Sequence, residues 1–402
     1  MSGIVVVGAG QAGASLVAKL RALGYDGALT LIGAETQPPY QRPPLSKSYL
    51  LGEMEEARLY LRPATFYAEN DITLRLNAPV SALDTTARTL DVGGEVVSYD
   101  QLALTTGAIP NRLPATLGGD LDHVFTVRTL ADIDRMSPLF QRNARVLVVG
   151  GGYIGLEAAA VASKLGLRVT LVEMAERILG RVAAPETAEY FRALHRSHGV
   201  DLREGVGLER LTGHEGRVAG AVLSDGHVLE VDFVIVGTGI RPDTRLAEAG
   251  GLTCDNGIVV DDMGRTSADG VWAAGDCAVF PFQGTQLRLE SVQNAIDQAE
   301  AVAANMLGAD APYVPSPWFW SDQYEVKLQI AGLNTGYDRV VVREGESSHS
   351  HWYYAGDTLL AVDAMNAPRD YMVGKRLIEA GKSPDADVIA DSASDLKALL
   401  RG

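Results

Sequence analysis

The sequence feature that most constrains the fold is a pattern that occurs twice, an apolar run followed by G-x-G-x-x-G. Residues 4–13 read IVVVGAGQAG, and residues 146–155 read VLVVGGGYIG. Each copy is followed by a stretch with helical character and then by a second apolar run, at residues 28–32 and 168–172. A strand, a glycine turn, a helix and a strand in this order predict a Rossmann-like dinucleotide-binding unit. Two copies therefore predict an α/β chain with two such domains.

The spacing of the glycines has a chemical reason. The first glycine permits a tight turn, the second lets the backbone approach a pyrophosphate, and the third lets the helix pack on the strand. An acidic side chain ~20 residues further on is expected to hold ribose hydroxyls. Glu35 lies 22 residues after Gly13, and Glu173 lies 18 residues after Gly155. Glycines kept only for packing would not explain both acids, so two bound dinucleotides are expected.

Three further apolar runs end in small residues, which lets the backbone lie close to a cofactor. They are residues 102–109 (LALTTGAI), 234–240 (VIVGTGI) and 271–276 (VWAAGD). The first two fit crossings between domains. Asp276, at the end of the third run, could accept hydrogen bonds from the ribityl chain of a flavin, or could cap the turn that follows it.

The composition excludes several other classes of protein. The chain has 35 Lys and Arg against 51 Asp and Glu, a net charge of −16, which argues against a nucleic-acid surface. Cys254 and Cys277 are too few for a disulfide scaffold or for a four-cysteine zinc or iron–sulfur site, and the seven histidines show no ligand pattern, so no metal is expected. Met1 leads almost directly into a short apolar strand, so neither a targeting segment nor a membrane span is expected. These features favour a reduced, cytoplasmic protein.

Taken together, the motifs resemble those of the two-dinucleotide-binding-domain flavoproteins related in fold to glutathione reductase. Within this FAD-dependent pyridine nucleotide-disulfide oxidoreductase superfamily, the sequence is similar to the oxygenase-coupled NADH:ferredoxin reductases, the putidaredoxin reductase-like family. Three segments support the narrower resemblance, namely residues 39–47 (PYQRPPLSK), 290–295 (ESVQNA) and 317–324 (PWFWSDQY). Disulfide reductases of the superfamily relay electrons through paired cysteines, and no such pair exists here. The resemblance therefore implies direct electron transfer to a protein acceptor.

The resemblance implies an FAD site drawn from many parts of the chain. Its expected residues are Gly8, Gly10, Ala12, Gly13, Glu35, Arg42, Pro44, Lys47, Val80, Arg128, Asp276 and Val292. The glycine turn would hold the pyrophosphate, with Arg42 supplying positive charge and Glu35 on the adenosine ribose. Lys47 would reach the isoalloxazine near N5, and Pro44 would pack close to the ring.

The other positions imply weaker contacts with the same cofactor. Val80 would contact the adenine end through its backbone, and Arg128 would lie near the flavin. Asp276 would contact the ribityl chain, and Val292 would contact the pyrimidine edge. Val292 also begins a helical stretch, residues 292–307, whose positive end could stabilise a reduced flavin.

The resemblance implies that NADH binds the second glycine turn. Its expected residues are Gly150, Gly152, Ile154, Gly155 and Glu173. An acid on the adenosine ribose repels a 2′-phosphate, so NADH is favoured over NADPH, although Arg177 lies only four residues beyond Glu173.

The implied catalytic residues are Lys47, Glu157 and Trp320. Glu157 would pair with Lys47 and meet the nicotinamide carboxamide, or it could simply favour the start of its helix. Trp318 and Trp320 would share one face of a strand. Trp320 would then lie over the flavin and nicotinamide on the ferredoxin-facing side, or it could be a core residue.

The predicted organisation has three domains. Residues 1–107 and 240–312 would form a split FAD-binding domain, residues 108–239 the inserted NADH-binding domain, and residues 313–402 a C-terminal α+β interface domain. Within the second, residues 218–229 read as a β-hairpin with an Asp-Gly turn.

The implied function is FAD-dependent NADH:ferredoxin oxidoreduction. A hydride would pass from NADH to flavin N5, and two single electrons would then pass to a 2Fe–2S ferredoxin. The ferredoxin would supply a haem-thiolate monooxygenase or a ring-hydroxylating dioxygenase, and the reductase would be a monomer or a weak homodimer. The alternatives are a rubredoxin or quinone reductase, or an NADH-sensing flavoprotein resembling apoptosis-inducing factor.

The strong negative charge constrains how a partner can dock. Ferredoxins of this kind are usually acidic, so docking requires a local basic rim together with apolar contact. The candidates are Arg62, Arg288, Lys327 and Arg369, with Glu300 in the same general region.

Overall fold

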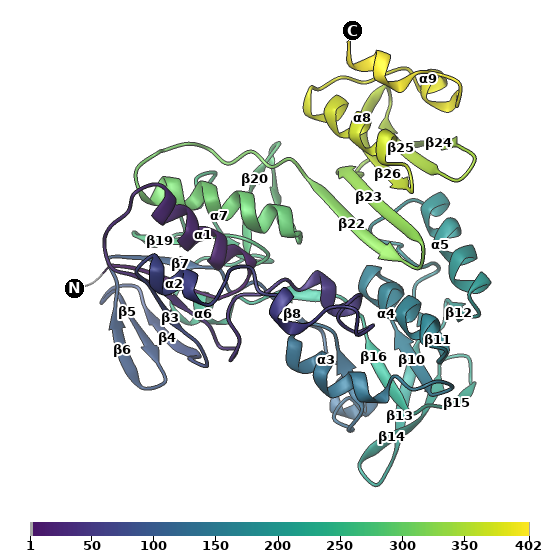
Figure 1. Cartoon of the computed structure of the whole chain (residues 1–402), viewed down its shortest axis with the longest axis horizontal. Helices are drawn as coiled ribbons and strands as arrows, with labels where there is room; N and C mark the ends of the chain where they lie inside the picture. Colours follow the sequence, from purple (N-terminus) through teal and green to yellow (C-terminus); the bar gives the residue numbers. More distant parts are fainter. Residues whose placement is uncertain (1–2, 402) are drawn as a thin grey trace. The chain divides into compact units, whose positions relative to one another are not determined.

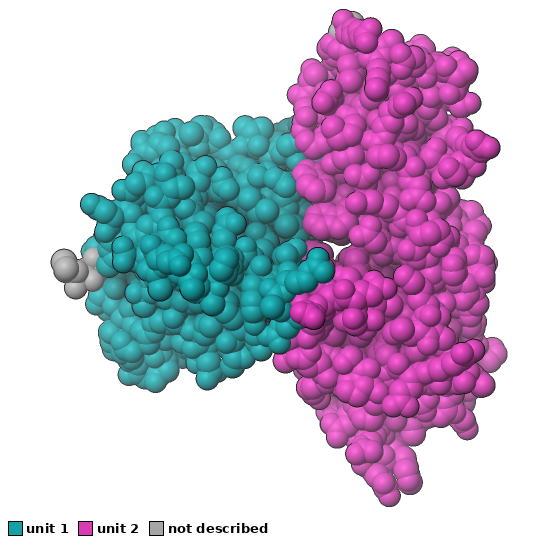
Figure 2. All heavy atoms as spheres, viewed as in Figure 1, with its two compact units in different colours: residues 1–41, 56–109, 240–317 teal, residues 42–55, 110–239, 318–402 magenta. Residues whose placement is uncertain are grey.

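A computed structural model of the chain describes residues 3–401. Met1 and Ser2, on which the expectation about a targeting segment partly rests, lie outside the described residues. The chain forms two compact units, shown in teal and magenta in Figure 2. Unit 1 comprises Met1–Gln41, Glu56–Ile109 and Ile240–Pro317, and unit 2 comprises Arg42–Glu55, Pro110–Gly239 and Trp318–Gly402. The three-domain boundaries given above stay a prediction.

Unit 1 is built on a five-stranded parallel sheet with the order β19-β7-β1-β2-β3 (Figure 1). The strands are β1 (Ile4–Val7), β2 (Leu29–Ile32), β3 (Ile72–Arg75), β7 (Gln101–Leu104) and β19 (Val271–Ala273). Parallel strands covered on both faces are apolar along their whole length, and all four residues of β1 are buried.

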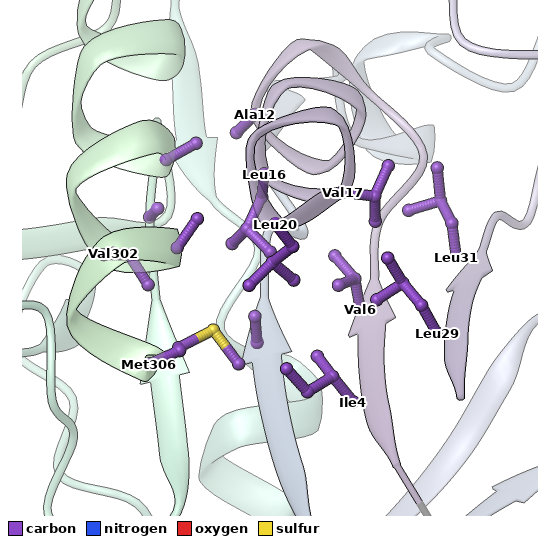
Figure 3. Packing of buried hydrophobic residues seen from close by; sticks show 14 of the residues in the cluster. Ile4, Val6, Ala12, Leu16, Val17, Leu20, Leu29, Leu31, Val302 and Met306 are labelled. Carbon is purple, nitrogen blue, oxygen red and sulfur yellow. The ribbon is translucent and has the colours of Figure 1, made fainter. Parts of the chain in front are cut away.

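Two helices cover one face of this sheet. The helices α1 (Gln11–Ala22) and α7 (Val292–Met306) lie side by side over the strands (Figure 3). Each presents apolar residues four positions apart, Leu16 and Leu20 on α1 and Val302 and Met306 on α7, all within one buried cluster. The remaining β1 side chains face a second cluster on the opposite side of the sheet. Each face of the sheet thus packs against its own hydrophobic core.

The smaller elements of unit 1 surround this sheet. The residues Val80–Asp84 (β4), Thr89–Val92 (β5) and Glu95–Ser98 (β6) form an antiparallel sheet. The other elements are η2 (Glu56–Arg58), α2 (Thr65–Glu69), β8 (Ala108–Pro110), β17 (Ile240–Pro242), α6 (Arg245–Ala249), β18 (Ile258–Val259), β20 (Ala278–Phe282) and β21 (Thr285–Leu287). Strands β8 and β17 pair with each other.

Unit 2 contains a second five-stranded parallel sheet, with the order β12-β11-β10-β16-β9 (Figure 1). The strands are β9 (Val124–Thr126), β10 (Arg145–Val149), β11 (Arg168–Glu173), β12 (Asp201–Glu204) and β16 (Phe233–Val236). Its helices are α3 (Leu130–Met136), α4 (Tyr153–Lys164) and α5 (Pro185–Ser197). The order β2-β1-β7 in unit 1 matches β11-β10-β16 here, which confirms the repeat predicted from the glycine motifs.

Two expectations about local structure are refined. The hairpin predicted at residues 218–229 is present as β14 (Arg217–Leu223) and β15 (Val228–Glu230), with Gly226 of the Asp-Gly turn at φ +85°. A third strand, β13 (Leu208–His214), pairs with the other edge of β14. The run at 102–109 splits into β7 and β8, and the run at 234–240 splits into β16 and β17. Each break contains a glycine with positive φ, Gly107 (+70°) or Gly239 (+94°), a conformation that a strand does not continue through.

The C-terminal part of unit 2 is an antiparallel sheet packed against a helix. Its strand order is β22-β23-β26-β25-β24 (Figure 1). The strands are β22 (Trp318–Gln323), β23 (Val326–Gly332), β24 (Arg339–Glu344), β25 (His349–Ala355) and β26 (Thr358–Met365), followed by α8 (Pro368–Glu379), α9 (Ala386–Ala390) and η5 (Leu396–Leu400). Trp352, Val362 and Leu377 form the centre of the core, each with at most 1% exposure. The predicted α+β character is therefore present.

A buried polar cluster joins α5 to this sheet. The Asp363 carboxylate accepts hydrogen bonds from the hydroxyls of Thr187, at 2.8 Å, and Tyr353. His351 Nδ1 lies 2.7 Å from Thr187 Oγ1. Burial raises the pKa of Asp363 to about 6 and lowers the pKa of His351 to about 4. Buried polar groups that bond to one another across this contact fix how the C-terminal sheet packs on α5.

No helix within residues 3–401 is both long enough and apolar enough to cross a bilayer.

Candidate functional site

The two glycine turns have the same geometry. Gly8 has φ +115° and Gly150 has φ +107°, and a Cβ on them would lie 2.1 Å from Thr105 O and 2.4 Å from Gly237 O. The last glycine of each motif packs helix against turn, because a Cβ on Gly13 would lie 2.0 Å from Gly8 O. The equivalent distance from Gly155 to Gly150 O is 2.1 Å. Steric contacts within the folded chain are therefore enough to require glycine at these four positions.

The middle glycines require a different explanation. Gly10 and Gly152 have ordinary φ angles of −94° and −80°, and no heavy atom lies within 4 Å of a Cβ built on either. Both are N-cap residues with no side-chain cap, so the first N–H groups of α1 and α4 have no capping side chain. An open cradle at a helix N-terminus fits a pyrophosphate. Packing within the protein does not explain why Gly10 and Gly152 lack a side chain, whereas the close approach of a bound dinucleotide does.

Each predicted ribose-binding acid lies near its own glycine turn. A Cβ on Gly33, just before Glu35, would lie 2.6 Å from Ala9 Cβ, and Tyr40 donates a hydrogen bond of 2.5 Å to Glu35 Oε2. In unit 2, the Glu173 carboxylate accepts hydrogen bonds of 2.7 Å from the N–H groups of Gly151 and Ala175. Both acids are thus held in a fixed position, Glu173 by the turn itself.

Other predicted FAD residues of unit 1 gather beside α1 and α7. Gly275 lies between these helices, because a Cβ on it would lie 3.0 Å from Ala12 Cβ and 3.9 Å from Ala295. Its N–H donates a 2.8 Å hydrogen bond to Gln298 Oε1 on α7. Asp276, the next residue, is therefore close to the start of both helices. Val292 is the first residue of α7.

Val80 is the first residue of strand β4. Its strand pairs with β5 through Val92. Its predicted contact with the adenine end stays a prediction.

Four predicted flavin-site residues belong to unit 2. Pro44 lies in the short helix η1 (Pro43–Ser46), which ends just before Lys47. Arg42 precedes that helix, and its guanidinium donates a 2.8 Å hydrogen bond to the carbonyl of Arg128. This bond ties the Arg42 side chain to the backbone at Arg128, and the Arg42 guanidinium supplies a positive charge suited to a phosphate.

The most distinctive feature of unit 2 is a buried ion pair. Lys47 Nζ lies 2.7 Å from Glu157 Oε2, and the Glu157 side chain is only 5% exposed. Ser46 Oγ donates to the same oxygen at 2.8 Å, and Ser321 Oγ donates to Glu157 Oε1 at 2.7 Å. Glu157 lies on α4, five residues after Gly152, so the pair stands beside the second glycine turn. These three donors together compensate for the cost of burying the carboxylate.

Aromatic side chains connect the same region to the C-terminal sheet. The rings of Trp318 and Trp320 lie 5.4 Å apart, which confirms that they share one face of β22. Phe319, on the other face, lies 5.1 Å from Tyr153 at the start of α4. Trp318 also lies 6.4 Å from Tyr371 on α8. Trp320 is half-buried, and its role over a flavin stays a prediction.

Both cysteines are free thiols. Cys277 is fully buried, its Sγ lies 3.4 Å from Ala274 O, and burial raises the pKa of its thiol. Burial also raises the pKa of Cys254. Neither thiol is therefore activated as a nucleophile. Among residues 3–401, no three His, Cys, Asp or Glu side chains are arranged to hold a metal ion.

Sequence reasoning missed the two serines that bind Glu157. Ser46 adjoins Lys47 and Ser321 adjoins Trp320, so both lie inside motifs that were recognised for other residues. The only signal available was their position beside those residues.

A comparison with protein-family models matches residues 2–299 to the family described as pyridine nucleotide-disulphide oxidoreductase. The chain belongs to this family. Residues 318–400 match a second model, described as reductase C-terminal.

Individual relatives resemble nearly the whole chain. Rhodocoxin reductase of Rhodococcus erythropolis is 41% identical, over 99% of this chain and 94% of its own length. A rubredoxin-NAD(+) reductase of Pseudomonas putida is 38% identical, over 91% of this chain and 96% of its own. Among solved structures, the covalent putidaredoxin reductase–putidaredoxin complex matches with a TM-score of 0.96 at 38% identity, covering 100% of this chain and 98% of that one. Family members use FAD and NAD(P)H, and the two glycine cradles fit both.

Proposed function

We propose that the protein is an FAD-dependent NADH:ferredoxin oxidoreductase that supplies an oxygenase. The observation that carries the proposal is the buried Lys47–Glu157 pair beside the second of two open glycine cradles. The absence of an activated cysteine pair favours a protein electron acceptor, and the relatives named above act on small electron carriers. The terminal enzyme would be a haem-thiolate monooxygenase or a ring-hydroxylating dioxygenase.

The residues divide the work between binding and orientation. FAD, when bound, supplies the redox chemistry by accepting a hydride and giving up electrons one at a time. Gly8, Gly10 and Gly13 bind its pyrophosphate at the start of α1, and Arg42 adds positive charge. The second turn and Glu173 bind NADH. Lys47 and Glu157 then orient the reacting ring and the nicotinamide.

Anaerobic titration tests this proposal directly. Addition of NADH to the FAD-loaded protein should bleach the flavin absorbance, and an added 2Fe–2S ferredoxin should restore it within seconds. An NADH-sensing flavoprotein would instead hold the reduced flavin with NAD⁺ for a long time.

The free, unactivated thiols fit a reducing compartment such as the cytoplasm.

The geometry around Glu173 favours NADH over NADPH. Two backbone N–H groups fix the carboxylate, so a 2′-phosphate at the ribose would meet an immobile negative charge. Arg177 does not offset this, because its guanidinium donates to the carbonyls of Ala183, at 2.8 Å, and Gly180, at 3.4 Å. The Arg177 guanidinium is therefore bonded within its own loop.

We expect Glu173→Ala to lower the ratio of kcat/KM for NADH over NADPH about tenfold, because it removes both the ribose acceptor and the repulsion. The measurement is steady-state reduction with each coenzyme. Glu176→Ala, which removes an exposed acid three residues away, is the matched control and should leave the ratio unchanged. An unaltered ratio in Glu173→Ala would remove Glu173 from the coenzyme site.

A basic groove in the C-terminal sheet domain is the proposed docking site for ferredoxin. Helix α8 and the segment η5 border an open groove of about 710 Å³, lined by Arg369, Arg376, Lys397 and Arg401 together with apolar residues that include Met372 and Val373. Within residues 3–401, none of these four cations forms an ion pair, although the chain carries a net charge of −16. Unpaired positive charge around apolar surface complements an acidic partner. Tyr371 on the same helix contacts Trp318, which connects the groove to the aromatic residues of β22.

The basic residues that the sequence suggested for ferredoxin docking differ in their surroundings. Arg369 lines this groove. Arg288 is 11% exposed and pairs with Glu290, so it does not present its charge to a partner. Arg62 lies over the Phe66 ring, and Lys327 is exposed on β23.

Reversing one charge tests the groove. Arg376→Glu should raise the KM for ferredoxin about tenfold at low ionic strength, and the effect should shrink in high salt because screening weakens the attraction. Flavin reduction by NADH should not change. Arg210→Glu, the same charge reversal on the exposed strand β13, should leave the KM within twofold of wild type. Equal effects of the two variants would mean that only net charge matters.

A further inference from the structure

A chain of hydrogen bonds runs from Glu157 through the C-terminal sheet to α5. Ser321 Oγ donates to Glu157 Oε1 at 2.7 Å, and Gln323 Nε2 lies 3.2 Å from Ser321 Oγ. Gln323 Oε1 lies 2.8 Å from His195 Nε2. His195 Nδ1 lies 3.3 Å from the hydroxyl of Tyr324. Strand β22 supplies Ser321 and Gln323, α4 supplies Glu157, and α5 supplies His195.

The donors in this chain all point toward the carboxylate. The single hydroxyl proton of Ser321 goes to Glu157, so Ser321 Oγ must accept from the Gln323 amide group. The Gln323 oxygen then faces His195, whose Nε2 must carry the proton. The remaining ring nitrogen, Nδ1, accepts from the Tyr324 hydroxyl. Donors aligned in one direction strengthen one another, and they stabilise a negative charge at the end of the chain.

Burial makes each link difficult to replace. Ser321, Gln323 and His195 have no exposed surface, so bulk water does not reach them. Burial also lowers the pKa of His195 to about 4, which keeps the ring neutral and limits it to one N–H at neutral pH. A lost donor would therefore leave an unsatisfied acceptor.

We propose that Ser321, Gln323 and His195 are positioning residues for Glu157 in nicotinamide binding, an inference that rests on the proposed function. A carboxylate offers about four lone-pair sites. Lys47 and Ser46 take two on Oε2, and Ser321 takes one on Oε1. The remaining Oε1 site is left for a ligand N–H, as the carboxamide of the nicotinamide supplies. The C-terminal sheet thus forms part of the coenzyme site.

Calorimetric titration of the FAD-loaded protein with NAD⁺ tests this role. Ser321→Ala should weaken NAD⁺ binding about fivefold to tenfold, because a charged hydrogen bond to the orienting carboxylate is lost. Ser321→Thr, which keeps the hydroxyl, should restore most of the affinity. Gln323 reaches Glu157 only through Ser321, so Gln323→Met should produce a smaller loss of NAD⁺ affinity. This variant also tests the proposal if Ser321→Ala fails to fold.

Ser350→Ala is the matched control. Ser350 is also fully buried in the C-terminal sheet and donates to a carboxylate, that of Asp370, at 2.6 Å, but it has no link to Glu157. It should lose stability without losing NAD⁺ affinity. Wild-type affinity in both Ser321→Ala and Gln323→Met, or equal losses in Ser321→Ala and Ser350→Ala, would overturn the proposal. Failure of the wild-type protein to bind NAD⁺ would instead contradict the proposed function.

The direction of the chain has its own spectroscopic signature. In ¹⁵N-histidine-labelled protein, His195 should show a protonated Nε2 and an unprotonated Nδ1, and it should stay neutral down to about pH 5. A protonated Nδ1 would reverse the donors and overturn the proposed polarity.

Discussion

Replacement of Lys47 by alanine is expected to slow reduction of the bound flavin by NADH about 100-fold, because Glu157 loses the cation that orients it and the site loses one of its positive charges. The chain should still fold. Ser46 and Ser321 continue to donate to the carboxylate, so the free energy of unfolding should fall by only about 1–3 kcal/mol. Rapid-mixing absorbance measurements give the reduction rate, and thermal melting gives the stability.

A second lysine provides the control for this effect. Lys19 forms an exposed pair with Glu300, with both side chains more than one third exposed, so Lys19→Ala should alter neither the reduction rate nor the stability appreciably. Glu157→Gln should slow reduction to a similar extent as Lys47→Ala, since it removes the other half of the pair. Wild-type reduction rates in Lys47→Ala would show that the buried pair has no part in hydride transfer.

The second large effect concerns two glycines of one motif. Gly10→Ala should leave the apoprotein as stable as wild type, because its Cβ meets no protein atom, but should weaken FAD binding at least ~100-fold by filling the cradle. Gly13→Ala should behave differently, because its Cβ would lie 2.0 Å from Gly8 O. The turn must then shift, at a cost of about 3 kcal/mol in stability. Melting of the apoprotein and titration with FAD separate the two effects.

The equivalent glycine of the second turn supplies the cross-check. Gly152→Ala should retain FAD and raise the KM for NADH, since its open cradle belongs to the other nucleotide. Tight FAD binding by Gly10→Ala, or loss of FAD in Gly152→Ala, would contradict the assignment of the two cradles.

Much of the fold was predictable because its signals are local. The glycine turns, the helices that follow them and the acids near each second strand are encoded within ~30 consecutive residues. The same is true of the Asp-Gly hairpin and of the two tryptophans that alternate along β22. Local requirements of this kind can be predicted from a short segment of sequence without knowing how the rest of the chain folds.

The contacts that complete the site were not predictable from local patterns. Ser321 and Glu157 are separated by 164 residues, and a buried serine leaves no distinctive signal in a strand. His195 lies 128 residues from Gln323, so its neutral, buried state depends on packing that the sequence does not display. The basic groove likewise forms only where α8 and η5 meet. Arg288 shows the reverse case, because its charge suggested a surface role and its burial excludes one.

The most direct test of the central claim is anaerobic, NADH-driven reduction of purified carriers by the FAD-loaded protein. The account predicts that kcat/KM for a 2Fe–2S ferredoxin exceeds that for a rubredoxin at least about tenfold, and that the advantage declines as salt is added. Faster reduction of rubredoxin, or bleached flavin that neither carrier reoxidises, would contradict it.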